Sequence, residues 1–265
     1  MSIPPRLAQG LVLFAGGLAL LPVAVLLVRR IFPGRNPFFL RYGFAKVVVG
    51  FALYAGVPAL LSALLPEFAL RAQLLSLAGG LAAFAFAAWI CARMQPEGWR
   101  ALGFHSGSHG RAVGAALLGL AFAAPAVLGA AESTRGLVEA AGGTVEPQRA
   151  LVDLLALEGG ALWVALALAI VVLPLCEELF FRGFLQPLCT QNFGDRGGIV
   201  VVSVLFMALH QPTSTWPAVF VLSMLLCGLM LRTQRILASW LAHALWNGAV
   251  LGVLLAWPQT REWLL

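Results

Sequence analysis

The chain has 265 residues, of which 61% are hydrophobic and only 11% are charged. A soluble domain usually carries about 45–50% apolar and about 25% charged residues, so this chain has too few charges to cover a water-exposed surface. The composition therefore excludes a soluble globular domain, a disordered chain and a secreted disulfide scaffold. It indicates an integral membrane protein, in which each helical span needs roughly 20 apolar residues.

Apolar segments bounded by charges or by Gly and Pro predict an all-α fold, a polytopic transmembrane helix bundle of about eight spans. No strand alternation and no internal repeat is visible in the sequence. In chain order the segments are 8–28, 47–65, 73–92, 112–131, 161–185, 198–210, 216–231 and 236–257.

The lengths of the connections divide the chain into four parts. Residues 1–131 hold N-terminal transmembrane helices 1–4, and residues 132–160 form the one long loop, which we expect to be extracytoplasmic. Residues 161–257 hold helices 5–8, and 258–265 form a short C-terminal tail. Residues 147–157 of the long loop are weakly amphipathic, so either a short interfacial helix or a plain connector is expected there.

The charges are distributed unevenly between the two sides of the predicted bundle. The loops after odd-numbered spans carry 11 basic and two acidic residues, whereas the side with both termini carries five basic and seven acidic ones. The positive-inside rule places the basic loops in the cytoplasm. Nearly all basic residues are Arg, and the chain is rich in Ala, Leu and Gly, so we expect a multi-pass protein of a bacterial cytoplasmic membrane.

The net charge of +6 could suggest a nucleic-acid partner. The basic residues, however, lie at the ends of apolar runs and form no patch with interleaved aromatic residues, so no nucleic acid is expected. The expected surroundings are the lipid bilayer, and no feature of the sequence predicts an oligomeric state. The four cysteines lie in apolar runs without a Cys-x-x-Cys pattern, which predicts small buried side chains.

Three charged residues end the fifth segment, namely Glu177, Glu178 and Arg182. Facing lipid, they would cost roughly 8–10 kcal/mol together. Glu178 and Arg182 are four residues apart on one helix face and can form an ion pair. Glu177 is turned about 100° from Glu178, so we expect it to be unpaired and available for another task. A structural salt bridge with a spare carboxylate at the water interface is the simpler interpretation, but one arginine neutralises only one of the two glutamates.

Histidines and an asparagine occur in two further spans. His210 ends the sixth segment after Phe206, and His243 lies inside the eighth segment with Asn247 one turn later. A single histidine in a span is often a packed, hydrogen-bonded group. Together with Glu177, these residues exceed what packing requires, and polar groups in a bundle face each other or a water-filled cavity. We therefore expect them to converge on one site. His105 and His109 lie in a Gly/Ser-rich loop and are expected to be solvated.

These residues form three motifs that occur in order, each in a separate predicted span. The motifs are Glu177-Glu178-(x3)-Arg182, Phe206-(x3)-His210 and His243-(x3)-Asn247. They resemble the motifs of the CPBP intramembrane proteases, a family that includes type II CAAX prenyl proteases and Abi-like bacteriocin-processing proteins. The likeness covers about residues 161–250. It implies that helices 5–8 are the catalytic part of an intramembrane endopeptidase acting on a membrane-bound protein or peptide.

The chain lacks the catalytic motifs of the other intramembrane protease classes. There is no His-Glu-x-x-His for a site-2-type zinc protease and no Gly-x-Ser-Gly for a rhomboid-like one. The two aspartates, Asp153 and Asp195, fall in predicted loops rather than in spans. The sequence also leaves two non-protease functions open, a non-catalytic membrane scaffold or bacteriocin-immunity-type protein, and a transporter. The lack of an inverted repeat disfavours the transporter.

Hydrolysis within a membrane needs a water, a base and donors to the oxyanion. We assign the base to Glu177, with His210 holding the same water, and the oxyanion donors to His243 and Asn247. The resemblance implies the same assignment, with Glu178, Arg182 and Phe206 in supporting positions. No cofactor is favoured. The alternative is a catalytic Zn²⁺ bound by Glu177, His210 and His243, with water as the fourth ligand.

Overall fold

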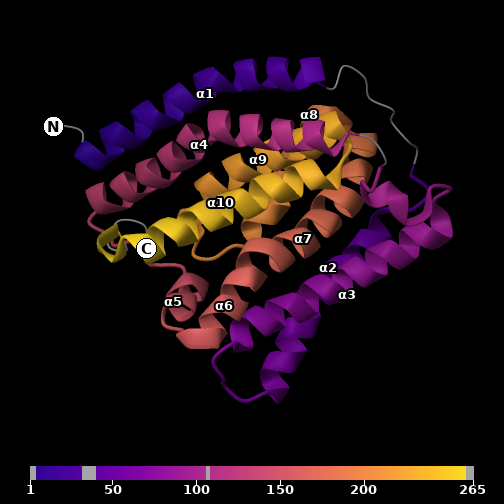
Figure 1. Ribbon diagram of the computed structural model, residues 1–265, viewed down its shortest axis with the longest axis horizontal. Helices are drawn as coiled ribbons and strands as arrows, with labels where there is room; N and C mark the ends of the chain where they lie inside the picture. The colour runs from indigo at the N-terminus through magenta and orange to yellow at the C-terminus, as the bar shows by residue number, and fades with distance from the viewer. Residues whose placement is uncertain (1–3, 32–39, 106–107, 261–265) are drawn as a thin grey trace.

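The computed structural model describes residues 4–31, 40–105 and 108–260, and these ranges contain helices and turns but no strand (Figure 1). The prediction of an all-α bundle is confirmed. The longer helices are α1 (Pro5–Ile31), α2 (Phe44–Leu64), α3 (Arg71–Met94), α4 (His109–Ala140), α8 (Gln186–Ala208), α9 (Trp216–Thr233) and α10 (Ile236–Ala256). The shorter ones are η1 (Gly98–Leu102), α5 (Arg149–Leu155), α6 (Gly159–Ala167), η2 (Leu168–Val172), α7 (Leu173–Glu178), η3 (Leu179–Leu185), η4 (Thr213–Thr215) and η5 (Pro258–Thr260).

Seven helical stretches in the described ranges are long and apolar enough to cross a membrane. One of them, Gly159–Ala208, has 50 residues. It would be about 75 Å long if straight, more than twice the thickness of the hydrocarbon core. The stretch reverses at Gly194, whose φ of +70° lies in the region that favours glycine, and Gly198 packs against Thr190 across the turn. If the helical segments before and after Gly194 are counted separately, the structure has the eight spans expected from the sequence.

The fourth span ends later than the sequence suggests. α4 continues to Ala140, so the first nine residues of the expected 132–160 loop are helical. The helix extends because α1 lies along it: Arg6 Nη1 is 2.6 Å from Glu139 Oε1, and Gly136 lies against the backbone of Leu7. Within the remaining loop, α5 confirms the short helix that was one of the two alternatives there.

α1 and α4 form a closely packed pair at one edge of the molecule (Figure 1). Gly17 of α1 lies against the backbone of Ala126, and Gly129 of α4 lies against the backbone of Phe14. At both glycines a Cβ atom would overlap the facing helix. Small residues allow helix backbones to approach closely in a membrane, where no hydrophobic force drives helices together.

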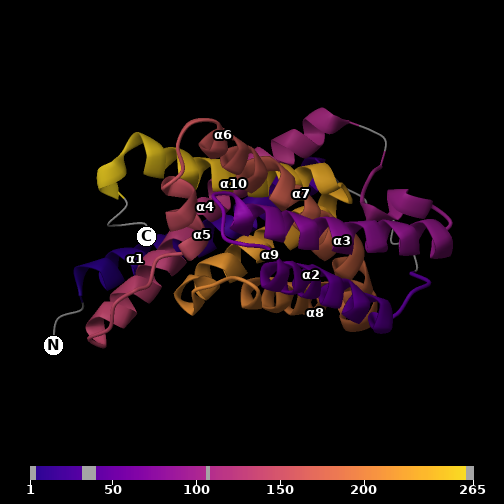
Figure 2. The same ribbon diagram turned by 90° about the horizontal axis from the view of Figure 1, so that it is seen from below.

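α7 occupies the middle of the molecule. Figures 1 and 2 show it between α10 on one side and α3 on the other, and it contacts both helices. The helical stretch continues from α7 into η3, where Phe180, Phe181 and Phe184 are almost fully buried in the main core cluster. A helix surrounded in this way holds its side chains in fixed positions, as a reactive site requires.

One prediction about the loop histidines is wrong. His105 is half-buried rather than solvated: its backbone carbonyl accepts a hydrogen bond from Arg235, and burial lowers the pKa of its imidazole. His109 is exposed, as expected, at the start of α4. Some sequence predictions lie outside the described residues, namely the loop charges Arg35 and Arg261, Ser106 and Gly107 of the histidine loop, and 261–265 of the tail.

Candidate active site

α7 is flanked by two π-helical stretches, η2 before it and η3 after it. In η2 the N–H of Leu173 bonds to the carbonyl of Leu168, five residues earlier. The next donor in that register would be Pro174, which has no N–H, so the carbonyl of Ala169 is left without its partner in the helix. Asn247 supplies the missing donor, with its Nδ2 3.0 Å from that carbonyl oxygen. The predicted site residue Asn247 therefore holds α10 against η2.

A second side chain of α10 makes the same kind of contact. Trp240 Nε1 donates to the carbonyl of Val171, also in η2, at 2.9 Å. Trp240 and Asn247 lie one turn before and one turn after His243, so the position of His243 relative to α7 is fixed from both sides. Stretches of π-helix are often found at functional sites, because they free backbone groups and redirect side chains.

Glu178 and Arg182 form the ion pair expected from their spacing. Arg182 Nη1 is 2.9 Å from Glu178 Oε1, and both side chains are completely buried. Arg182 Nη2 also donates to Ser223 Oγ of α9 at 2.9 Å, and the guanidinium carbon lies 4.2 Å from the ring centre of Phe206. The Arg182 side chain thus connects α9 and α8 to the α7–η3 segment, with the Phe206 ring packed against its guanidinium.

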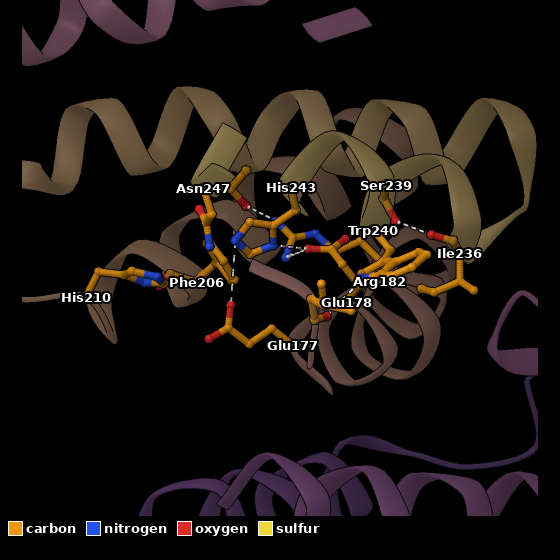
Figure 3. Close-up of polar contacts among 12 residues, drawn as sticks. Glu177, Glu178, Arg182, Phe206, His210, Ile236, Ser239, Trp240, His243 and Asn247 are labelled. Atoms are coloured by element: carbon orange, nitrogen blue, oxygen red, sulfur yellow. Dashed lines mark hydrogen bonds and ion pairs between the residues drawn. The ribbon is translucent and has the colours of Figure 1, made fainter. Parts of the chain in front are cut away.

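His243 lies between the two glutamates of α7 (Figure 3). Its Nδ1 is 3.0 Å from Glu178 Oε1, and its Nε2 is 3.8 Å from Glu177 Oε2. Because Arg182 pairs with Glu178 as a carboxylate, the carboxylate is the acceptor and Nδ1 of His243 carries the hydrogen. Sequence reasoning predicted only a supporting role for Glu178 at the helix end. The structure adds that Glu178 orients His243.

Glu177 is the most accessible of the three charged side chains, with 20% of its surface exposed. The expectation that it has no partner is wrong. The hydroxyl of Tyr54, on α2, donates a hydrogen bond to Glu177 Oε1 at 3.2 Å. Tyr54 was missed because it lies in the middle of an apolar segment, where it resembles any core aromatic. The feature of the sequence that could have revealed Tyr54 is its hydroxyl, since a tyrosine inside a protein usually finds a hydrogen-bond partner.

His210 lies in the turn after α8, outside the candidate spans. Its Nδ1 is 2.8 Å from the carbonyl oxygen of Phe206. A carbonyl only accepts, so Nδ1 carries the hydrogen and Nε2 has a free lone pair when the ring is neutral. Burial lowers the pKa of His210 despite the nearby charge of Glu177, which favours that neutral form near pH 7.

The predicted site residues are brought together to different degrees. Phe206 contacts both histidine rings, with centroid distances of 4.6 Å to His210 and 5.9 Å to His243. Figure 3 shows His210 beyond Phe206, on the side away from Arg182. Among the described residues, no hydrogen bond or ion pair joins His210 to Glu177 or His243. Direct contacts join five of the other predicted site residues, namely Glu177, Glu178, Arg182, Phe206 and His243. Asn247 lies one helical turn after His243.

A metal ion has no ready site in the described part of the chain. No three His, Cys, Asp or Glu side chains there are close enough to hold one. The set Glu177, His210 and His243 therefore does not fit Zn²⁺ in this arrangement. The four cysteines are free and buried, as their apolar surroundings predicted.

Comparison with known families agrees with this geometry. Residues 159–249 match the family model described as "Type II CAAX prenyl endopeptidase Rce1-like". Neither the search of curated proteins nor that of solved structures found a match. The matched segment begins with α6 and ends in α10, just after Asn247, so it contains every predicted site residue. Tyr54 lies outside it.

The apolar helices define an integral, multi-pass membrane protein, and its matched segment resembles an intramembrane endopeptidase. The segment from α6 to α10 is similar to the Rce1-like type II CAAX prenyl endopeptidases, which supports the resemblance to the CPBP proteases noted in the sequence. Such proteases act on membrane-associated substrates.

Proposed function

We propose that this protein hydrolyses a peptide bond of a membrane-bound protein or peptide, with Glu177 as the base that activates water. The observation that carries the proposal is the contrast between two adjacent glutamates. Glu178 is completely buried and paired with Arg182, whereas Glu177 is partly exposed and lies next to His243 without a cationic guanidinium of its own. A carboxylate with this exposure can contact a water and remove its proton.

The charges of the cluster bear on the protonation state of His243. Two carboxylates inside a helix bundle require two positive charges, and Arg182 supplies one of them. We propose that His243 is an imidazolium and supplies the other, donating from Nδ1 to Glu178 and directing its Nε2–H toward Glu177. The four groups are then neutral as a set, which lowers the cost of keeping them away from water.

The reaction follows from these positions. Glu177 takes a proton from water while the water oxygen bonds to the substrate carbonyl carbon, and the carbonyl electron pair moves to its oxygen. Nε2–H of His243 and the second N–H of Asn247 donate to this oxyanion, each worth roughly a factor of 10²–10³ in rate. Glu177 then passes its proton to the amide nitrogen as the C–N bond breaks. The other O–H of the water donates a hydrogen bond to His210 Nε2, which orients the water.

The depth of the site suggests the side from which substrate and water enter. His243 is seven residues from the start of α10, and Tyr54 is ten residues from the start of α2. These positions lie roughly 10 Å and 15 Å from helix ends that carry the basic loops. With those loops in the cytoplasm, the reaction takes place in the cytoplasmic half of a bacterial cytoplasmic membrane.

Glu177→Gln tests the proposal, because it preserves size and removes the base. Membrane peptides of cells with the wild-type protein are compared by mass spectrometry with those of Glu177→Gln cells and of cells with Glu67→Gln, a matched change at an exposed glutamate. A peptide spanning the mapped cleavage site is then assayed with purified protein in liposomes. We expect Glu177→Gln to cleave about 10²- to 10⁴-fold more slowly and Glu67→Gln to cleave at the wild-type rate.

Three results would overturn parts of this account. Wild-type cleavage by Glu177→Gln would remove Glu177 as the base. Identical membrane peptides in all three cell lines would favour the non-catalytic scaffold or immunity-type protein. Stoichiometric zinc in the purified protein, with activity lost to a chelator and restored by zinc, would replace the metal-free mechanism with the zinc alternative.

A further inference from the structure

We propose that Tyr54 is a positioning residue that fixes the Glu177 carboxylate for reaction with water. This inference rests on the proposed function of Glu177. It also places part of the working site in α2, outside the segment that matches the family. The helices before α6 would then contribute to the chemistry in addition to the packing.

The two oxygens of the Glu177 carboxylate have different neighbours. Oε1 accepts the hydrogen bond from the Tyr54 hydroxyl at 3.2 Å, and Oε2 faces His243 Nε2 at 3.8 Å. The terminal torsion of a glutamate is broad, so a carboxylate without such contacts turns easily. A hydrogen bond on one side and the imidazole ring on the other restrict the plane of the carboxylate. They also limit the directions from which a water can approach a free lone pair.

The Tyr54 ring is itself held firmly. It stacks on Phe180 at a centroid distance of 6.0 Å with 14° between the planes, and it meets Phe181 edge-on at 6.0 Å and 84°. Both phenylalanines are almost fully buried in η3, the segment that directly follows α7. On the other side of α2, Gly79 of α3 lies against the carbonyl of Tyr54, where a Cβ atom would overlap. A rigid support of this kind is what a positioning residue needs.

The same contacts predict a kinetic effect confined to the chemical step. Tyr54 donates to Oε1 of the base, whereas His243 faces Oε2, so we expect Tyr54 to act on the base and not on the bound substrate. A hydrogen bond to a charged group has an energy that corresponds to roughly tenfold to hundredfold in rate. Loss of the hydroxyl should therefore lower kcat by up to that factor and leave KM unchanged, because the carboxylate is no longer held in the orientation that the reaction needs.

The chain offers a matched control, since it has two tyrosines. The hydroxyl of Tyr42 donates to the carbonyl of Phe184 at 2.7 Å, and its ring stacks on Phe184 at 4.5 Å. Tyr42 is thus a second phenol bonded to the same helical stretch, but its hydroxyl does not contact the site. We expect Tyr54→Phe to lower kcat roughly tenfold to hundredfold at unchanged KM, and Tyr42→Phe to keep the wild-type kcat.

The experiment uses the full-length protein in liposomes and the peptide mapped with the Glu177→Gln comparison, and it includes the double variant Tyr54→Phe/Glu177→Gln. If Tyr54 acts through Glu177, removing its hydroxyl has no further effect once the base is gone. A multiplicative loss in the double variant would overturn the inference. So would a wild-type kcat in Tyr54→Phe while Glu177→Gln is inactive, or an equal loss in Tyr42→Phe. Wild-type activity in Glu177→Gln would overturn the proposed function itself.

Discussion

The α1–α4 and α7–α10 contacts join helices by opposite means. α1 and α4 approach through glycines, with Gly17 and Gly129 each lying against the backbone of the facing helix. α7 and α10 meet through charged groups, with His243 of α10 between Glu177 and Glu178 of α7. The first contact depends on shape and the second on charge.

This difference separates stability from reactivity. A close contact between small residues stabilises the bundle without requiring any particular chemical group. A buried set of ionisable groups is costly in a membrane, and such sets are found where a function needs them. Substitutions at the α1–α4 contact should therefore alter folding alone. Substitutions at the α7–α10 contact should alter activity, and also folding where they leave a buried charge unpaired.

The largest effect on stability is expected for Arg182→Leu. This change leaves the carboxylate of Glu178 fully buried and without its guanidinium partner, and breaking a buried ion pair in this way typically costs about 3–5 kcal/mol. Unfolding of the purified variant in detergent, followed by circular dichroism, measures the loss.

The double variant Arg182→Leu/Glu178→Leu is the control for Arg182→Leu. It should recover most of the stability, because replacing both members of a buried ion pair by apolar residues is often neutral. It should still cleave poorly, because His243 has lost the acceptor of its Nδ1–H. Wild-type stability of Arg182→Leu alone would contradict the role given to this ion pair.

A smaller loss of stability, about 1–3 kcal/mol, is expected for Gly17→Val, where the added side chain meets the backbone of Ala126. The neighbouring Gly16→Val is the matched control, because nothing lies within 4 Å of a Cβ atom at that position. Thermal unfolding and the cleavage rate per folded molecule are measured for both. A lower kcat in Gly17→Val at unchanged stability would show that the α1–α4 contact is coupled to the site.

The smallest effect is expected for Trp240→Phe. The change removes the hydrogen bond to the carbonyl of Val171, worth about 0.5–1.5 kcal/mol, while Asn247 still holds α10 against η2. Thermal unfolding should detect the loss, and cleavage should fall only a few-fold. Trp89→Phe, at an exposed tryptophan of α3, is the control and should change neither the thermal midpoint nor the cleavage rate. A loss of cleavage as large as that of Glu177→Gln would mean that Trp240 acts in the reaction itself.

Features that depend on the energetics of a single segment could be predicted from the sequence. The length of apolar runs and the cost of charges within them predicted the spans and the pairing of Glu178 with Arg182, because both follow from one segment at a time. The end of α4 was predicted too early, because Glu132 and Arg135 resemble loop residues although a helix can continue beyond the membrane.

Contacts between distant segments could not be predicted in this way. The Tyr54–Glu177 hydrogen bond joins residues 123 positions apart, and it depends on how α2 and α3 pack against η3. The orientation of His243 between two glutamates likewise follows from the contacts of α10 with η2. Pro174 is visible in the sequence, but the π-helical register that leaves the carbonyl of Ala169 to Asn247 is not.

The central claim is that Glu177 and His210 act on one water molecule next to His243. The position of solvent in a high-resolution experimental structure of the protein in lipid tests this claim most directly. We predict an ordered water within about 2.7–3.2 Å of both a Glu177 carboxylate oxygen and Nε2 of His210. A dry gap between these two groups, or another side chain bonded to Nε2 of His210, would contradict the account.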